Sequence, residues 1–239
     1  MEKSKKVKIT LGLFYLIVVS TFLYFFLSKF SLEELTSYEF IKNNRDYFFD
    51  LKKSNLLILT LIFFISTVIW ILMAGFALPL ALLAGFIFDK WLGTFVLVFG
   101  MSVGATFLYI FGNYFLKEII KTKFSIKFRD LEIKFKKSEF IYLLFYRFVG
   151  GIPFVISNVL PCIFNVKVKN FFLATFIGII PQIFLIVSIG SGLEKIIDQN
   201  LEAPSVKDLI FSPNIYFPLI GFFLLIIFTI LLRKLFYKK

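Results

Sequence analysis

Arg147 is the residue of this chain with the clearest chemical potential, because it lies inside the apolar segment Phe140–Val166, about seven residues from its start. An arginine at the centre of a bilayer costs a few kcal/mol, so it needs polar surroundings. Its planar guanidinium can hold a phosphate or another anion. Gly150, Gly151 and Pro153 follow closely, and a backbone broken there offers further N–H donors to an anion. The alternative is that Arg147 extends to the lipid headgroups.

Two amide side chains are further candidates to bind a substrate. Asn158 follows the glycine–proline break, and Gln182 comes directly after Pro181 in an otherwise apolar helix. Asn158 could instead cap a helix, and Gln182 could bond across helices. Arg147, Asn158 and Gln182 are therefore the predicted substrate-binding residues. The residues expected to shape the broken backbone are Pro79, Gly85, Gly150, Gly151, Pro153 and Pro161.

The composition excludes most catalytic chemistry. The chain has no histidine, and Cys162 is its only cysteine. The apolar segments hold no carboxylate cluster, so we expect no catalytic residue, no metal site and no cofactor, and hence no enzyme. The net charge of +12 does not indicate nucleic acid as a partner, since the lysines and arginines cluster beside apolar segments, as the positive-inside rule describes.

The hydrophobicity indicates an all-α integral membrane protein. Hydrophobic residues make up 59% of the chain, and the mean hydropathy is +0.89. Several uncharged runs approach the length of a membrane span. We expect one membrane domain at residues 55–192, preceded by a basic segment, a first helix and a linker at 1–54. An external loop and a last helix with a basic tail follow at 193–239.

The stretch 56–88 has no charged residue, and its length is unusual. As one helix it would be on the order of 50 Å long, against a hydrocarbon core of about 30 Å. Two complete spans with a turn need more than about 40 residues. We therefore predict a re-entrant helical hairpin that turns near Gly75 and Pro79. A turn at membrane depth survives only where protein or a polar cavity satisfies its backbone.

The charge distribution favours a second hairpin at about 140–166. The segment Lys117–Glu139 carries eight basic and four acidic residues. The positive-inside rule places it in the cytoplasm together with both termini, provided that 56–88 does not cross the membrane. The prediction is about four transmembrane helices and two re-entrant hairpins in an inverted repeat. The predicted order is a helix at 10–28, hairpin at 56–88, helix at 92–116, hairpin at 140–166, and helices at 168–190 and 214–235.

An ordered set of motifs runs through the membrane domain: Pro79, Ala84-Gly85-x-x-Phe88, Gly93-Thr94 and Gly104-Ala105-Thr106, then Arg147-Phe-Val-Gly-Gly-Ile-Pro153-Phe154 with Asn158, and Phe171-x-x-x-Thr175-x-x-Gly178-Ile179-x-Pro181. This set resembles the DedA superfamily, most closely its SNARE-associated Golgi protein branch with the VTT domain. The resemblance covers about residues 55–192. It implies two facing re-entrant hairpins and the movement of lipids between leaflets, either phospholipid scrambling or recycling of polyprenyl-phosphate carriers.

The resemblance predicts a lipid transporter or scramblase whose partners are phospholipid or polyprenyl-phosphate headgroups. Classical DedA proteins carry an acidic residue in the first hairpin, whereas 56–88 has none, so a passive pathway fits better than proton coupling. The alternatives are an ion-coupled small-molecule transporter and a membrane scaffold. The N-terminal lysines favour a bacterial plasma membrane, and the oligomeric state, a homo-oligomer included, stays open.

Overall fold

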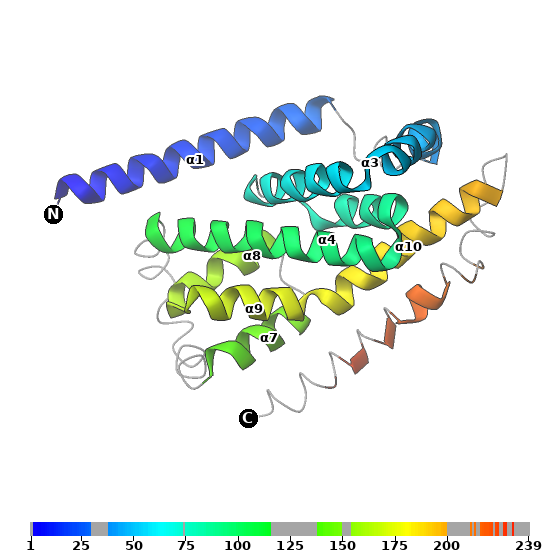
Figure 1. Cartoon of the computed structure of the whole chain (residues 1–239). Helices are drawn as coiled ribbons and strands as arrows, with labels where there is room; N and C mark the ends of the chain where they lie inside the picture. The colour runs from blue at the N-terminus through cyan, green and yellow to red at the C-terminus, as the bar shows by residue number, and fades with distance from the viewer. Residues whose placement is uncertain are drawn as a thin grey trace. The chain divides into compact units, whose positions relative to one another are not determined.

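The computed structural model describes residues 2–29, 38–73, 75–115, 138–149 and 154–199, together with scattered positions between 211 and 231. Every regular element in these ranges is a helix and none is a strand, which confirms the all-α prediction (Figure 1). Half of the predicted helix at 214–235 and the break at 150–153 lie outside the described residues. The elements are α1 (Glu2–Lys29), α3 (Tyr38–Leu72), α4 (Ala77–Phe115), α7 (Glu139–Val149), α8 (Phe154–Val159), the 3₁₀ helix η1 (Leu160–Phe164), α9 (Val168–Gly178) and α10 (Ile180–Gln199).

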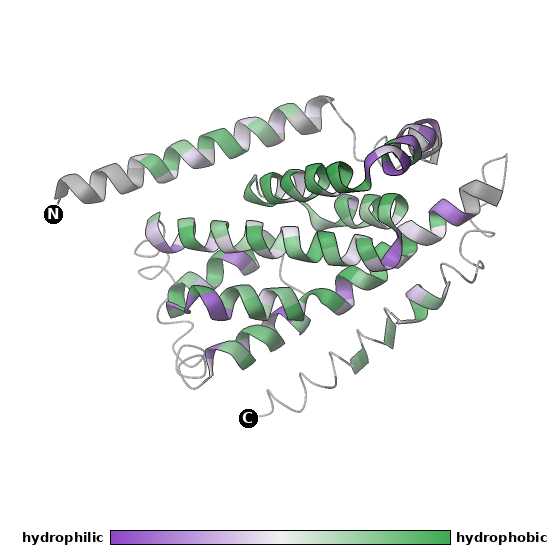
Figure 2. Cartoon of the chain, viewed as in Figure 1, coloured by the Kyte–Doolittle hydropathy of each residue, from purple (hydrophilic) through white to green (hydrophobic). Residues whose placement is uncertain are grey.

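Two of the described helices are long and apolar enough to cross a membrane, Asp46–Leu72 and Ala77–Phe115. The bent pair Val168–Gly178 and Ile180–Lys195 would be a third if its two helices form one span. Figure 2 shows α4 and the later part of α3 as almost continuously hydrophobic, while the earlier part of α3 is more polar. The chain is therefore a membrane protein, as its composition predicts.

The apolar stretch 56–88 forms two helices joined by a short turn. The turn lies between Leu72 and Ala77, where the N–H of Gly75 donates to the carbonyl of Trp70 at 2.9 Å. The indole N–H of Trp70 donates to the carbonyl of Phe76, also at 2.9 Å. Pro79 lies in the first turn of α4, where its missing N–H breaks no helical bond. Trp70 thus stabilises the turn, because its carbonyl accepts one hydrogen bond from the turn and its indole donates another.

The two ends of this stretch lie together. α3 is kinked at Asn55, whose side-chain oxygen accepts the N–H of Ile58 and so starts the apolar helix. α4 is kinked at Asp89, whose carboxylate lies 3.5 Å from the ammonium group of Lys52. We call the region around this ion pair the base of the first hairpin. The chain thus returns at Asp89 to the place that it left near Asn55.

The second apolar stretch has the same plan. α7 leads away from its base, and α8 with η1 leads back. At the base, the carboxylate of Glu139 accepts the backbone N–H of Lys167 at 3.1 Å and the side-chain N–H of Asn170 at 2.8 Å. In both hairpins, therefore, a polar contact joins a residue near the start of the hairpin to the backbone corner that follows its second arm.

The corners after the two hairpins share an unusual backbone. Asp89 (φ 66°) and Asn165 (φ 51°) are the non-glycine residues with positive φ in the described part of the chain. Each follows its hairpin and precedes an apolar helix. In addition, Ile71 packs against Gly104 and Arg147 packs against Gly178, so in each repeat a hairpin residue meets a glycine of the following helix. The inverted repeat of two re-entrant hairpins stays a prediction.

The predicted helix at 168–190 is broken at Ile179, between α9 and α10. The break has a local cause, because Pro181 lacks the N–H needed to continue a helix from α9 and clashes with the preceding turn. The first predicted helix is also longer than expected, since α1 begins at Glu2.

The chain divides into two compact units. Unit 1 comprises residues 1–31, 68–76 and 101–178, and unit 2 comprises 32–67, 77–100 and 179–239. In unit 2, α4 and α10 touch through glycines: a Cβ on Gly85 would lie 1.9 Å from the carbonyl oxygen of Val187, and one on Gly190 would lie 2.2 Å from that of Leu82. Gly85 therefore shapes the fold through helix packing.

Asp89 provides a test of the corner after the first hairpin. Its φ of 66° and ψ of 172° fall in a region that is essentially restricted to glycine and costs other residues about 1–3 kcal/mol. Asp89→Gly and Asp89→Ala both lose the ion pair with Lys52, but only glycine relieves the strain. We expect Asp89→Gly to be more stable than Asp89→Ala by about 1 kcal/mol or more in thermal unfolding of the detergent-solubilised protein. Equal stabilities of Asp89→Gly and Asp89→Ala would contradict the positive φ angle at Asp89.

Candidate functional site

Arg147 is buried within unit 1. It lies on α7 and is 4% exposed. Its Nε donates to the hydroxyl of Thr175 on α9 at 3.0 Å, and its Nη1 donates to the hydroxyl of Ser157 on α8 at 2.6 Å. The guanidinium thus joins three helices and does not extend to the exposed surface.

Aromatic rings surround this guanidinium. Its central carbon lies 5.0 Å from the ring centroid of Phe171, 5.4 Å from that of Phe154 and 6.0 Å from that of Tyr146. The negative faces of such rings attract a cation, by about 0.5–2 kcal/mol per ring. Rings and neutral hydroxyls lower the cost of burying Arg147 without cancelling its charge.

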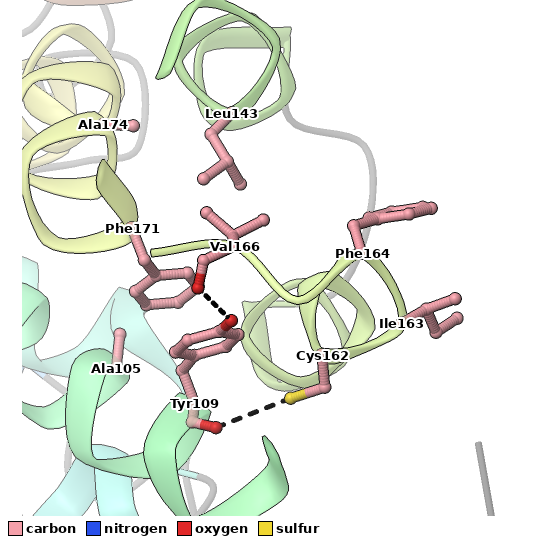
Figure 3. Packing of buried hydrophobic residues seen from close by; sticks show 9 residues of the cluster. All are labelled: Ala105, Tyr109, Leu143, Cys162, Ile163, Phe164, Val166, Phe171 and Ala174. Carbon is pink, nitrogen blue, oxygen red and sulfur yellow. Dashed lines mark hydrogen bonds between the residues drawn. The ribbon is translucent and has the colours of Figure 1, made fainter. Parts of the chain in front are cut away.

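The Arg147 site rests on the packed cluster drawn in Figure 3. The ring of Phe171 stacks on that of Tyr109, with centroids 4.4 Å apart and planes 13° apart. The Tyr109 hydroxyl donates to the carbonyl of Val166 at 2.5 Å, and the thiol of Cys162 contacts the carbonyl of Tyr109 at 3.5 Å. Cys162 is therefore a buried packing residue, and this cluster fixes α9 and η1 beside α4.

Gly178 makes room for Arg147. Phe171, Thr175 and Gly178 are four and three residues apart, so they share one face of α9. A Cβ on Gly178 would lie 2.6 Å from the Cβ of Arg147 and 3.1 Å from the carbonyl oxygen of Leu144. The arginine stem therefore lies directly on the glycine, which brings the guanidinium within reach of Thr175.

Asn158 is the second predicted site residue in this unit. It is completely buried on α8, and within the described part of the chain neither the nitrogen nor the oxygen of its amide has a hydrogen-bond partner. The buried hydroxyl of Tyr146 is in the same condition. Asn158 lies four residues after Phe154, on the helical face that meets Arg147. A buried amide without partners costs about 1–3 kcal/mol, so Asn158 is a candidate for a ligand contact.

The other predicted residues have different places. Gln182 lies on α10 and belongs to unit 2, whereas Arg147 and Asn158 belong to unit 1. Pro161 is buried near the start of η1. Gly150, Gly151 and Pro153 lie outside the described residues. Sequence reasoning missed Ser157, because nothing in its spacing sets it apart from other hydroxyls in apolar segments, whereas Thr175 and Gly178 were visible only within the family motif.

The groups around Arg147 are of the kinds that bind an anion. Among the described residues no group of three histidine, cysteine, aspartate or glutamate side chains could hold a metal ion. The groups gathered in unit 1 are a cation, hydroxyls and an amide. Such groups recognise a phosphate or carboxylate through charge-assisted hydrogen bonds.

The chain is thus an all-helical membrane protein that buries a cation between helices of unit 1. Residues 76–192 match the VTT domain family, which confirms the resemblance to the VTT branch of the DedA superfamily.

Similar proteins include a Transmembrane protein 41 homolog of Caenorhabditis elegans, 26% identical over 136 residues, covering 54% of this chain and 55% of that protein. A Transmembrane protein 41 homolog of Dictyostelium discoideum is 28% identical over 145 residues, which cover 58% of this chain and 42% of that protein. Transmembrane protein 41B of Xenopus laevis is 28% identical over 135 residues, which cover 53% of this chain and 48% of that protein. The matches thus span about half the length of these curated relatives. No solved structure matches this chain.

The contact between Gly178 and Arg147 can be tested by adding one methyl group. Gly178→Ala should destabilise the protein by about 1–3 kcal/mol, because the stem of Arg147 and a backbone carbonyl must move. Gly112→Ala is the matched control: its Cβ would lie 3.1 Å from the Cys162 sulfur, which can shift, so its cost should be smaller. Thermal unfolding of both variants measures the difference. A Gly178→Ala protein as stable as Gly112→Ala would contradict this packing.

Proposed function

We propose that this protein moves phospholipid or polyprenyl-phosphate between membrane leaflets, with Arg147 as the contact for the anionic headgroup. The observation that carries the proposal is the burial of Arg147 among hydroxyls and aromatic rings, beside an Asn158 amide with no described hydrogen-bond partner. An arginine kept at this cost inside an apolar unit is a functional residue by default. The match to the VTT family makes a lipid-related role plausible.

The geometry suggests how a headgroup would be held. Ser157 and Thr175 fix the guanidinium from two helices, so its orientation is set before a ligand arrives. The Asn158 amide could then donate to a phosphate oxygen, and a hydrogen bond to a charged group contributes about 1.5–3 kcal/mol. The headgroup would pass along a groove formed by the tip of the first hairpin and the second hairpin, while its acyl chains stay in lipid. No covalent step is needed, so the protein is not proposed to be an enzyme.

The membrane topology belongs to the same proposal. Both hairpins would be re-entrant, because their ends are tied together at the base by Lys52–Asp89 and by Glu139 with Lys167. The charge pattern then places both termini in the cytoplasm, and a bacterial plasma membrane is the setting that we favour. The first hairpin contains no carboxylate, which supports a passive pathway over an ion-coupled one.

Lipid movement in proteoliposomes tests this function directly. Fluorescent phospholipid and a membrane-impermeant quencher report the exchange between leaflets. We expect wild type to exchange lipid, and Arg147→Gln to be slower by roughly tenfold or more, the loss of one charged hydrogen bond. Arg147→Lys should also be slow, because an ammonium group cannot bridge Ser157 and Thr175 as the guanidinium fork does.

The matched control is Lys167→Gln, which removes one exposed positive charge while the backbone bond of Lys167 to Glu139 remains. It should exchange lipid like wild type. If Arg147→Gln, folded and inserted, equals wild type, Arg147 is not the headgroup contact and a scaffold becomes the better account. If wild type moves neither phospholipid nor polyprenyl-phosphate, the transport proposal is wrong and a small-molecule transporter or a scaffold replaces it.

A further inference from the structure

Unit 2 contains a cavity that shares no residue with the Arg147 site. It has a volume of about 490 Å³ and lies between one face of α10, the corner after the first hairpin and residues near 213–218. Its size falls within the usual range for small-molecule sites, about 300–1,000 Å³. The lining residues of α10 include Phe184, Ser188, Ser191 and Lys195, whose spacing of three to four places them along one side of the helix.

The polar part of the lining is suited to an anion. Lys90 and Lys195 supply two ammonium groups, and no carboxylate lines the cavity. Within the described residues neither lysine is part of an ion pair, and Asp89, the acid next to Lys90, is paired with Lys52. The hydroxyl of Ser188 donates to the carbonyl of Phe184 at 2.7 Å, so its proton is already used within α10. The positive charge of the lining is thus left without a described counter-charge.

The rest of the lining is apolar and aromatic. Phe184, Leu185 and Phe217 contribute large hydrophobic side chains. The ring of Trp91 supports Phe184 from outside the lining, with ring centroids 5.1 Å apart. A cavity lined by two cations and by aromatic rings suits a molecule with an anionic end and an apolar end, because a small inorganic anion would leave the apolar part unused.

We propose that this cavity binds an anionic amphiphile, a lipid with a phosphate headgroup. Lys90 and Lys195 contact the phosphate oxygens, and one acyl chain lies against Phe184 and Phe217. The site requires no movement of the lipid between leaflets, so it stands even if the transport function does not. It differs in residues and in unit from the site around Arg147.

Native mass spectrometry of the detergent-purified full chain can count the bound lipids. The probes are phosphatidic acid and phosphatidylcholine with the same acyl chains. We expect wild type to bind phosphatidic acid at least tenfold more tightly than phosphatidylcholine, and Lys90→Gln/Lys195→Gln to lose that preference. Both lysines are exposed, so the substitutions leave the packed core intact, and circular dichroism checks the helical content.

The matched control is Lys167→Gln/Lys169→Gln, which removes two exposed lysines elsewhere in the chain and should keep the preference. Each comparison is repeated in an Arg147→Gln background, so that lipid held at the proposed transport site does not enter the count. Excess inorganic phosphate distinguishes a lipid site from a phosphate site: lipid should stay bound, and its displacement would overturn the lipid assignment. A Lys90→Gln/Lys195→Gln protein with an unchanged preference for phosphatidic acid would overturn the site itself.

Discussion

Each apolar hairpin is closed at its base by a polar contact, and the rest of the architecture depends on this closure. Lys52 with Asp89, and Glu139 with Lys167, bring the start of a hairpin to the corner that ends it. The exposed Lys52–Asp89 ion pair contributes at most about 1 kcal/mol, and the backbone hydrogen bond to Glu139 about 0.5–1.5 kcal/mol, so these contacts select an arrangement more than they stabilise it. Once the ends lie together, an apolar stretch must turn at its far end, and its broken backbone must be satisfied by neighbouring protein.

The turned hairpins pack through small residues, and this packing places the polar groups. Gly104 accepts Ile71, and Gly178 accepts Arg147. The equivalent position thus carries an aliphatic side chain in one repeat and a cation in the other. Around Arg147, α8 and α9 supply the hydroxyls of Ser157 and Thr175 as hydrogen-bond acceptors. The aliphatic side chain of Ile71 requires no such partners. The two hairpins therefore share a contact between a hairpin residue and a glycine of the following helix, and in the second hairpin that residue is a cation.

The sequence was sufficient for the helical class, the membrane setting and the break in the first apolar stretch, because uncharged length is visible without coordinates. It also singled out Arg147 as a cation within an apolar segment. It was insufficient for the partners of Arg147. Ser157 has no distinguishing spacing, and its role arises only when α8 folds back on α7. The break at Ile179 was also missed, although Pro181 gives a local reason for it. The cavity beside Lys90 joins residues about a hundred positions apart, so no local pattern could predict it.

Side-specific labelling of single cysteines tests the central claim, that each hairpin enters and leaves on one side of the membrane. Cys162 is the only native cysteine, so Cys162→Ala gives a background without thiols. In intact cells or oriented vesicles, an impermeant maleimide should label Ser54→Cys and Lys90→Cys from the same side, and Ser138→Cys and Lys167→Cys both from the opposite side. Labelling of Ser54→Cys and Lys90→Cys from opposite sides would show that residues 56–88 cross the membrane and would contradict the account.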